Sequence, residues 1–473
     1  MTYQVEKKLQ LPLYQIYICT ATLSKVKNEL NLSSNLSITT DIWTSSSMKA
    51  FLAVTAHYIN GSQLNSYLLE TKQLVDRHSA GNVASALREG FESWDIFEKV
   101  HCIVTDNASN MRNAITVHLN KTHQPCIAHT LNLCTMNTLK HADLQQLLEK
   151  CKNIVGHFKR STVASGELAK MQDQMKLPLL KVKQDVSTRW NSCLTMMQRL
   201  EELKVPLSAA MSNLPGSPSL LSSEDWALIK DCICILKPIE AMTSELSGEK
   251  YITLSIIIPL IRGVQHAVEN AQPITSTGKV LQTNFHDILL RRLGYVESSK
   301  ICAKATLLDP RLKILAFDKV INGNQALKWI TQEVEDLIVT ITQHLETPNS
   351  EIPCTQGRAD SSENQASLLW EHFDIKAKQE FSASTPTHSA EAQIKQYLDL
   401  PLVDRKLNPL DFWESKKEMF PQLYKLANKY LCVPATSVPS ERVFSKADEL
   451  TKDRRSRLSS NMINEIMFLN SNM

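Results

Sequence analysis

The sequence predicts an α/β fold in which a small mixed sheet precedes a long helical region. Three observations lead to this fold class. Strand-like segments are concentrated before residue 130, and helical periodicity dominates from Leu131 to about His344. Gly is scarce, at 12 of 473 residues, and aromatic residues make up only 6% of the chain. This composition favours long helices over a fold of short strands and many turns.

The elements of the first third can be read in chain order. Asn60-Gly61 lies between two β-rich runs, which is typical of a hairpin. The order of strands and helices predicts a sheet with both antiparallel and parallel parts. The expected elements are an amphipathic helix over 20–31, strands over 36–43, 51–59 and 64–69, a helix over 80–94, a strand over 100–105, a helix through Met111 and Ile115, and a short strand near 126–128.

The composition is that of a globular protein with a sizeable core. Hydrophobic residues make up 43% and charged residues 21%, which excludes a wholly disordered or fibrous chain, and the length predicts about three folding units. The longest apolar run, over 251–261, is too short to cross a bilayer. Eleven Cys residues, with no CxxC pair, argue against a disulfide framework and favour a reducing nuclear or cytosolic compartment.

Two stretches have strongly biased charge. Residues 150–189 contain nine Lys or Arg and three acids, which suits either a solvated helix face or a surface that follows phosphates. Residues 331–380 contain ten acids and three bases. Within the second stretch, 346–365 is rich in Ser, Pro, Asn and Glu without periodicity, which predicts a mobile linker. Helices are then expected over 391–398, 411–430, 438–450 and 460–469.

Two acids directly follow predicted strands: Asp41 after 37–40, and Asp106 after 102–105. Open α/β sheets bind ligands at the carboxyl ends of their strands. Two carboxylates there can hold Mg²⁺, and a metal pair about 3.5–4 Å apart would activate water for phosphodiester cleavage. An Asp in this position is more often a cap or turn residue, so the residues alone leave both interpretations open.

Six motifs occur in one order along the chain. They are TTDIWTS (39–45), VTDNASNM (104–111), CIAHTLNL (126–133), DVSTRWNS (185–192), LLDPRLK (307–313) and VPSERVFS (438–445). Together they closely resemble the hAT superfamily of transposases and their domesticated descendants, especially the BED-zinc-finger group. The resemblance extends from about residue 30 to the C-terminus.

The resemblance implies an RNase H-like core that is interrupted by a large all-helical insertion, with a helical C-terminal dimerisation region. The helical stretch of this chain lies where such an insertion should be. The expected domains are an N-terminal helical segment (1–30), the first part of the core (31–135), the helical insertion (136–345), an acidic flexible linker (346–390), and the dimerisation region with the end of the core (391–473).

The family's DDE triad of catalytic acids matches Asp41, Asp106 and Glu441. By resemblance these three residues are also the metal ligands, for Mg²⁺ or Mn²⁺. Glu441 lies on the predicted helix over 438–450, where Val443 and Phe444 belong to the apolar stripe and Glu441 to its polar flank. Without the resemblance, an exposed helix carboxylate would be the simpler interpretation.

Three further residues are candidates for DNA contact by the same resemblance. Trp190 would stack on an unpaired or flipped base, a contact of about 1–3 kcal/mol, and Arg189 would hold the adjacent phosphate. A Trp on a helix is more often core packing. His129 would contact phosphate or water. Cys126 and His129 have CxxH spacing, but no second ligand pair lies nearby, so no zinc site is expected in this chain.

The expected partners are DNA and a second copy of the chain, in the nucleus, with no membrane and no small-molecule substrate. Two apolar stripes in the C-terminal region suit self-association or an intramolecular core. One consists of Trp413, Phe420, Leu423, Leu426 and Tyr430, and the other of Leu458, Met462, Ile466 and Leu469. The basic run over 452–457 suits nuclear import, DNA contact or a solvated turn.

Three functions are open. The first is a hAT-derived nuclear protein that dimerises and associates with DNA but no longer mobilises it, because this sequence contains no BED zinc finger and only about 30 residues precede the match. A truncated product would look the same. The second is a catalytically competent transposase core that cleaves and transfers DNA strands with Mg²⁺. The third is an interaction scaffold without DNA affinity.

Overall fold

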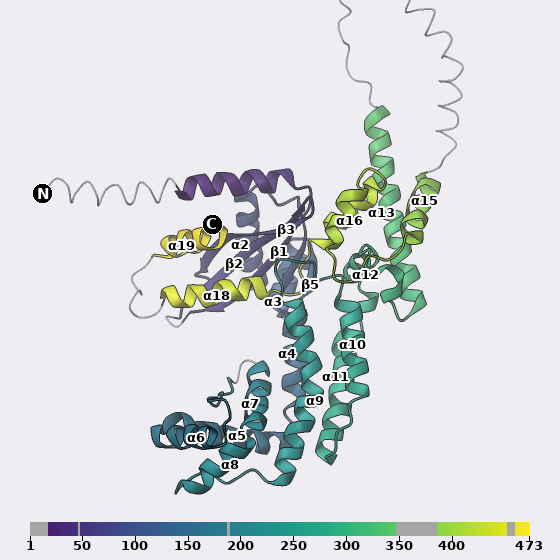
Figure 1. Cartoon of the computed structure of the whole chain (residues 1–473). Helices are drawn as coiled ribbons and strands as arrows, with labels where there is room; N and C mark the ends of the chain where they lie inside the picture. The colour runs from purple at the N-terminus through teal and green to yellow at the C-terminus, as the bar shows by residue number, and fades with distance from the viewer. Residues whose placement is uncertain (1–17, 46–47, 187–189, 347–385, 452–458) are drawn as a thin grey trace, which may run out of the picture.

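The computed structural model describes residues 18–45, 48–186, 190–346, 386–451 and 459–473. Figure 1 shows a sheet packed between helices, with a long helical arm extending away from it. Helices from residues 386–431 lie where the arm joins the sheet, on the side opposite to the direction in which the arm extends. The predicted fold class, an RNase H-like α/β core with a large helical insertion, is confirmed.

The sheet has five strands in the order β3-β2-β1-β4-β5. The strands β1, β2 and β3 pair antiparallel, and β4 and β5 extend the sheet in parallel from β1. The expected mixed sheet is therefore present. Its strands are β1 (Leu36–Thr44), β2 (Ala50–Asn60), β3 (Gln63–Leu74), β4 (Val100–Thr105) and β5 (Thr122–Pro125).

Alternation along β1 gives the sheet two different faces. Leu36 and Ile38 point into a core that is formed with a helix over 18–32, with α2 (Ala80–Ser93) and with α3 (Ser109–Asn113). A π-helical turn, Ala114–His118, follows α3. The opposite face is covered by the last elements of the chain, α18 (Val438–Thr451) and α19 (Ser460–Asn472). The early strands and the late helices thus form one structural unit.

The helix α19 covers the outer edge of the sheet. Asn472 accepts a hydrogen bond from the Leu68 amide at 3.0 Å and donates one to the Leu68 carbonyl at 2.7 Å, while Asn464 accepts from the Thr71 amide at 2.6 Å. These side chains form hydrogen bonds with β3 that a neighbouring strand would otherwise form. Unpaired backbone groups at a sheet edge invite pairing with other chains, and here they are satisfied within the protein.

The insertion is a helical arm. In Figure 1, α4, α9, α10 and α11 run side by side away from the sheet, and α5, α6, α7 and α8 form a cluster at the far end. One continuous apolar core runs through the arm. The helices are α4 (Ile127–Thr138), α5 (Ala142–Arg160), α6 (Thr162–Gln174), α7 (Trp190–Glu202), α8 (Lys204–Asn213), α9 (Ser223–Leu246), α10 (Ile257–Glu269), α11 (Ser276–Leu293), α12 (Lys300–Leu307) and α13 (Val320–Glu346).

The end of the insertion packs on α15 (Pro386–Asp399), α16 (Pro409–Lys416) and α17 (Pro421–Leu431). We call this region the charged junction, because buried ion pairs and charge-assisted hydrogen bonds hold it together. Its members are Lys304, Asp309, Arg311, Lys313, Glu333, Tyr397 and Tyr430.

Each charge of the charged junction has a partner. Asp309 is fully buried, forms an ion pair with Arg311 at 2.7 Å, and accepts a hydrogen bond from Ser255 at 2.6 Å. Lys304 is paired with Glu333, whose carboxylate also accepts a hydrogen bond from the Tyr430 hydroxyl at 2.6 Å. Buried charges of this kind are tolerated only when they are paired.

A second part of the charged junction binds the end of α15. The Lys313 ammonium donates to the Tyr397 carbonyl at 2.7 Å, and the Tyr397 hydroxyl donates back to the Leu307 carbonyl at 3.0 Å. The LLDPRLK motif therefore docks the insertion onto the C-terminal region. This motif had no predicted role in the sequence.

Two expectations about local structure are wrong. The short strand lies at Thr122–Pro125 rather than near 126–128, because Cys126 already caps α4. In the last helix, Ile463, Met467 and Phe468 are buried, whereas Met462 of the predicted stripe is 48% exposed. The stripe from Trp413 to Tyr430 is buried inside the protein. The expected linker (346–390) and the basic run over 452–457 lie almost wholly outside the described residues.

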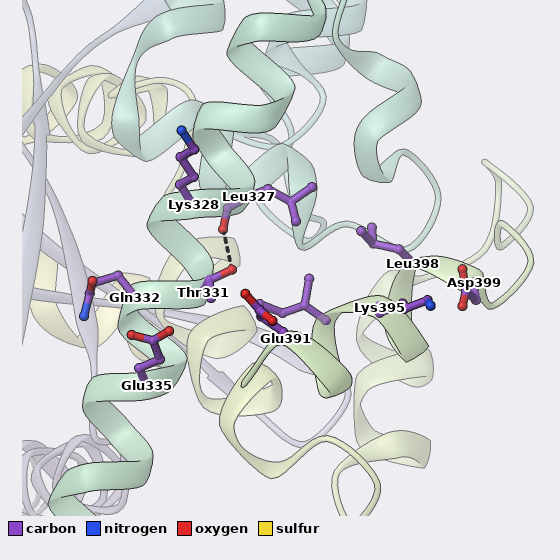
Figure 2. A pocket seen from close by; sticks show the side chains of 10 residues that line it. Leu327, Lys328, Thr331, Gln332, Glu335, Glu391, Lys395, Leu398 and Asp399 are labelled. Carbon is purple, nitrogen blue, oxygen red and sulfur yellow. Dashed lines mark hydrogen bonds between the residues drawn. The ribbon is translucent and has the colours of Figure 1, made fainter. Parts of the chain in front are cut away.

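A cavity of about 700 Å³ opens between α13 and α15, and none of the predicted acids lines it. Figure 2 shows Leu327 and Leu398 beside polar and charged side chains such as Lys328, Glu335 and Lys395. The Thr331 hydroxyl within it donates to the carbonyl of Leu327 at 3.0 Å. In the part of the chain that the structure describes, no helix is both long and apolar enough to cross a membrane.

Candidate active site

The sheet register brings the two early acids to the same level. The parallel pairing of β1 with β4 places Thr39 beside Val104, and two residues further along each chain come Asp41 and Asp106. Asp41 lies within β1, which continues to Thr44, so it does not end its strand as expected. Asp106 directly follows β4. Both acids therefore lie where the parallel pairing stops, at the carboxyl edge of the sheet.

One face of β1 meets the late segment at every second residue. The Ser37 hydroxyl donates to the Cys432 carbonyl at 2.8 Å, and Thr39 accepts a hydrogen bond from the Ser440 hydroxyl at 3.2 Å. The Trp43 ring stacks on the Phe444 ring, with 4.2 Å between centroids. Asp41 belongs to this same alternating face, so its carboxylate is on the side that α18 covers.

Glu441 lies in the first turn of α18, one residue after Ser440. The approach to this helix is fixed by hydrogen bonds to two earlier parts of the chain, the start of α4 and the segment before α10. The Ile127 amide donates to the Ala435 carbonyl at 3.0 Å, the Ala435 amide donates to the Thr253 hydroxyl at 2.9 Å, and the Ser437 amide donates to the Cys126 thiol at 3.3 Å. Glu441 is thereby returned to the sheet from 400 residues away.

The strand register and the contact of α18 with β1 place the three acids in one region, and the pKa of Asp41 responds to both of the other acids. Burial, followed by the negative charge of Asp106, raises the pKa of Asp41 to about 7, and Glu441 adds to the rise. A hydrogen bond from the Ile42 amide to Asp41 Oδ1 at 2.8 Å opposes it. Like charges disfavour the ionised form only over short distances in a protein. The structure thus brings Asp41, Asp106 and Glu441 into one acidic centre.

The donor set of the acidic centre suits Mg²⁺ or Mn²⁺, because all three side chains offer carboxylate oxygens. The ligands are not drawn together into a finished coordination shell. Across the described ranges, no three His, Cys, Asp or Glu side chains stand in an arrangement that could already hold a metal ion. The Glu441 side chain is exposed and the two Asp side chains are half-buried, so solvent reaches all three.

Cys126 and His129 lie beside the acidic centre at the start of α4. Cys126 is the buried cap of this helix, and its sulfur accepts hydrogen bonds from the His129 amide at 3.4 Å and the Ser437 amide at 3.3 Å. Burial raises the pKa of the Cys126 thiol, and Glu441 contributes to the rise. Cys126 is thus a structural cap. His129 is half-buried in the first turn, and its contact with phosphate or water stays a prediction.

Of the two other predicted DNA contacts, the structure describes only Trp190. Trp190 is the first residue of α7 and is only 3% exposed, packed in the core of the arm. Its backbone amide donates to the Asn132 side chain at 3.5 Å. In this arrangement the indole is core packing, and a base could stack on it only after the surrounding helices moved. Arg189 lies outside the described residues.

Sequence reasoning missed the polar residues that hold the acids in place. Thr39, Ser440 and Cys126 each stand within three residues of a predicted site residue and belong to the quoted motifs. Their roles depend on contacts between β1, α4 and α18 that no local pattern specifies. The only signal for these residues in the sequence is that each resembling motif extends beyond its predicted site residue and includes them.

Comparison with known proteins agrees with this architecture. Residues 39–146 match the ZBED1 RNase-like domain, and residues 124–235 match the ZBED1 RNase-like helical domain. Residues 393–473 match the hAT family C-terminal dimerisation region. The first two matches cover the sheet and the beginning of the arm, and the third covers the late helices that return to the sheet.

Whole-chain relatives belong to the same group. Zinc finger BED domain-containing protein 4 of Homo sapiens is 27% identical over 463 residues, which cover 93% of this chain and 38% of the relative. Zinc finger BED domain-containing protein 6 of Homo sapiens is 25% identical over 496 residues, covering 97% of this chain and 50% of the relative. The putative AC transposase of Zea mays is 23% identical over 474 residues, covering 92% of this chain and 56% of the relative.

The chain spans only about half the length of these relatives. The three domain matches nevertheless follow one another in the order that the fold requires, and the predicted resemblance is confirmed. The chain is a member of the hAT family of transposase-like proteins and carries the hAT dimerisation region.

Proposed function

We propose that this protein is a nuclear, self-associating, DNA-binding protein whose acidic centre binds Mg²⁺ or Mn²⁺. The observation that supports the proposal is the convergence of two chain segments on Asp41. The register of β1 with β4 brings Asp106 to its level, and the Ser440–Thr39 hydrogen bond brings the start of α18 to the same face. Burial raises the pKa of Asp41, and Asp106 and Glu441 both add to the rise. Proteins rarely hold like charges together without a function for them. A divalent cation would remove the repulsion.

Asp41, Asp106 and Glu441 are the residues that would hold the cation. When bound, it would supply an activated water and charge stabilisation for phosphodiester cleavage. The chain's own contribution is to fix the carboxylates. Asp41 Oδ1 accepts from the Ile42 amide at 2.8 Å, and Asp106 Oδ1 accepts from the Ala108 amide at 3.2 Å, so each Asp has one oxygen oriented by the backbone.

DNA binding is supported by cations in the arm. Lys159 and Arg160 end α5 and are exposed, and neither forms an ion pair with any described residue. Lys150 and Lys152 are instead paired with Asp225 and Asp185, at 3.0 and 2.9 Å. The arm therefore carries both solvated ion pairs and cations that are available to phosphates.

Strand cleavage is the second candidate function, and the acidic centre favours it. The buried Trp190 counts against a step that stacks a flipped base on its ring. We therefore rank DNA association without mobilisation above strand cleavage. The names of the relatives include both zinc finger proteins and a transposase. The dimerisation region supports self-association. The nuclear location follows from the DNA partner.

Binding of a duplex over a series of KCl concentrations, measured by fluorescence anisotropy, tests the DNA partner. The Lys159→Ala/Arg160→Ala variant should reduce the slope of log K against log salt by about 1.8, since each phosphate contact contributes about 0.9. Lys279→Ala, an exposed cation on α11, is the control. An unchanged slope in the double variant would place the DNA surface elsewhere, and no binding by the wild type would reject a DNA partner.

Titration with Mn²⁺, followed by electron paramagnetic resonance, tests the acidic centre. The wild type should bind, and Asp41→Asn, Asp106→Asn and Glu441→Gln should each weaken binding at least tenfold. A nicking assay with Mg²⁺ on the same proteins separates the two candidates. Nicking that Asp106→Asn abolishes would establish strand cleavage, whereas metal binding without nicking would leave DNA association as the function. Wild-type protein that does not bind Mn²⁺ would reject the metal site.

A further inference from the structure

We propose that four hydrogen-bonded side chains, Ser66, His57, Thr39 and Ser440, act as positioning residues that set the distance between Glu441 and Asp41. The inference rests on the proposed metal site and extends it to residues that do not touch the metal. We call these four residues the buried relay. It crosses the sheet from β3 through β2 and β1 to the first turn of α18.

Each link of the buried relay is a normal hydrogen bond. His57 Nδ1 lies 2.8 Å from the Ser66 hydroxyl, and His57 Nε2 lies 2.9 Å from the Thr39 hydroxyl. The Ser440 hydroxyl donates to Thr39 at 3.2 Å. Thr39, His57 and Ser440 are buried, so water does not compete for these bonds. Broken, each would leave a buried polar group unsatisfied, at a cost of about 1–3 kcal/mol.

The position of the hydrogen bond between Ser440 and Thr39 explains how it affects the site. Ser440 directly precedes Glu441, and Thr39 precedes Asp41 by two residues on the same face of β1. A single bond therefore joins the two backbone segments that carry two of the acids. The link between Ser440 and Thr39 is a polar tether that acts against the repulsion between these acids. Trp43 stacked on Phe444 provides a second, apolar tether further along.

His57 adds no charge to the buried relay. Burial lowers the pKa of His57 to about 3, so the imidazole is neutral at physiological pH and has one donor and one acceptor nitrogen. Thr39 can therefore be held between one neutral ring and one serine without a charge near the acids. A protonated His57 would place a positive charge near the carboxylates and would compete with a metal ion for them. The neutral ring does not.

The strand offers a matched control for this proposal. Thr40 is the next residue of β1, is equally buried, and donates a hydrogen bond to the Ala53 carbonyl at 2.7 Å. Its side chain points to the opposite face and does not contact α18. Thr40→Val thus removes a buried hydroxyl of the same kind from the same strand without touching the buried relay.

The experiment compares Thr39→Val, Thr39→Ser, Thr40→Val and Ser440→Ala in the full chain, with Mn²⁺ affinity and urea unfolding measured on each. Thr39→Val and Ser440→Ala should weaken Mn²⁺ binding about tenfold or more, as loss of residues behind metal ligands does elsewhere. Thr39→Ser, which keeps the hydroxyl, should restore affinity. Thr40→Val should lose stability but keep wild-type affinity.

The outcomes separate this inference from the proposed function. If wild-type protein binds no Mn²⁺, the metal site itself is rejected and the buried relay loses its role. If the wild type binds and both Thr39→Val and Ser440→Ala bind equally well, the buried relay is only structural and the inference is overturned. If Thr39→Val does not fold, Ser440→Ala, which removes the same link from the helix side, decides the question.

Discussion

The late part of the chain packs on preceding elements at two places that are built on opposite electrostatic principles. At the charged junction, buried acids and bases are paired, as Asp309 with Arg311 and Glu333 with Lys304. At the acidic centre, three carboxylates lie together, and the contacts that hold them come from neutral groups: the hydroxyls of Thr39 and Ser440, the thiol of Cys126 and stacked rings.

The difference separates scaffold from site. Paired buried charges fix one geometry, and removing either partner leaves an uncompensated charge. Like charges that lie close together destabilise the folded state, and such strain is typical of binding and catalytic sites. The same kind of substitution, an acid to a neutral residue, should therefore have opposite effects on stability in the two places.

The largest effect is expected at the charged junction. Asp309→Ala should lower the free energy of unfolding by about 3–5 kcal/mol, because it leaves Arg311 without its buried partner. Urea denaturation followed by circular dichroism measures the loss. Lys417→Ala, which removes an exposed pair with Glu414, serves as the control and should show no measurable change. A loss at Asp309 no larger than in this control would remove the distinction between the two regions.

The second prediction concerns pH at the edge of the charged junction. Burial, and then the Lys429 charge, lowers the pKa of His101 to about 3, below the 6.5 of the unfolded chain. Between these values the unfolded state binds a proton that the folded state does not, so stability falls as the pH falls below 6.5.

His101→Asn tests this titration. The amide can still donate to the Leu36 carbonyl, which His101 Nδ1 contacts at 2.9 Å, but it does not titrate. As the pH falls from 6 to 4, the free energy of unfolding should decrease less steeply in the variant than in the wild type, by up to about 1.4 kcal/mol per pH unit. Chemical denaturation at several pH values measures the slope, and an unchanged slope would mean that His101 is not a source of acid sensitivity.

The third prediction is a smaller effect of opposite sign at the acidic centre. Asp41→Asn should raise the free energy of unfolding by about 1 kcal/mol at pH 8 without divalent cations, because it removes a charge that burial, Asp106 and Glu441 disfavour. The amide oxygen can still accept from the Ile42 amide.

The gain at Asp41 should depend on pH in a defined direction. The folded-state pKa of about 7 lies above the ordinary value of 3.8, so the wild type loses stability as the pH rises from 3.8 to 7, and the variant does not. The advantage of Asp41→Asn should vanish near pH 4. Destabilisation at pH 8 would instead show that Asp41 belongs to the scaffold.

The sheet could be predicted from the sequence because its strands have strong local patterns. The strand expected over 100–105 is observed at Val100–Thr105, and the runs on both sides of Asn60-Gly61 form the hairpin of β2 and β3. The short β5 was misplaced because its four residues, Thr122–Pro125, carry no alternation of their own. Its position is set by pairing with β4.

The three acids of the candidate site could be chosen from the sequence, but their arrangement in space could not. Local patterns place Asp41 and Asp106 near strand ends, whereas the return of Glu441 depends on contacts of 435–440 with the start of α4, the segment before α10, and β1. The role of Trp190 could not be decided from its motif, because burial of its ring follows from packing within the arm. The buried relay was also invisible, since hydroxyls and a His on separate strands carry no common periodicity.

The 400 residues between Asp41 and Glu441 have a consequence for biosynthesis. A ribosome adds about 5–20 residues per second, so Asp41 would be synthesised roughly 20–80 s before the third acid. During that time α18 and α19 do not yet exist, and the strand edge that Asn464 and Asn472 later cover is open to chaperones or to other nascent chains. Premature termination between Asp106 and Glu441 yields a polypeptide that contains the first two acids of the acidic centre and lacks the third.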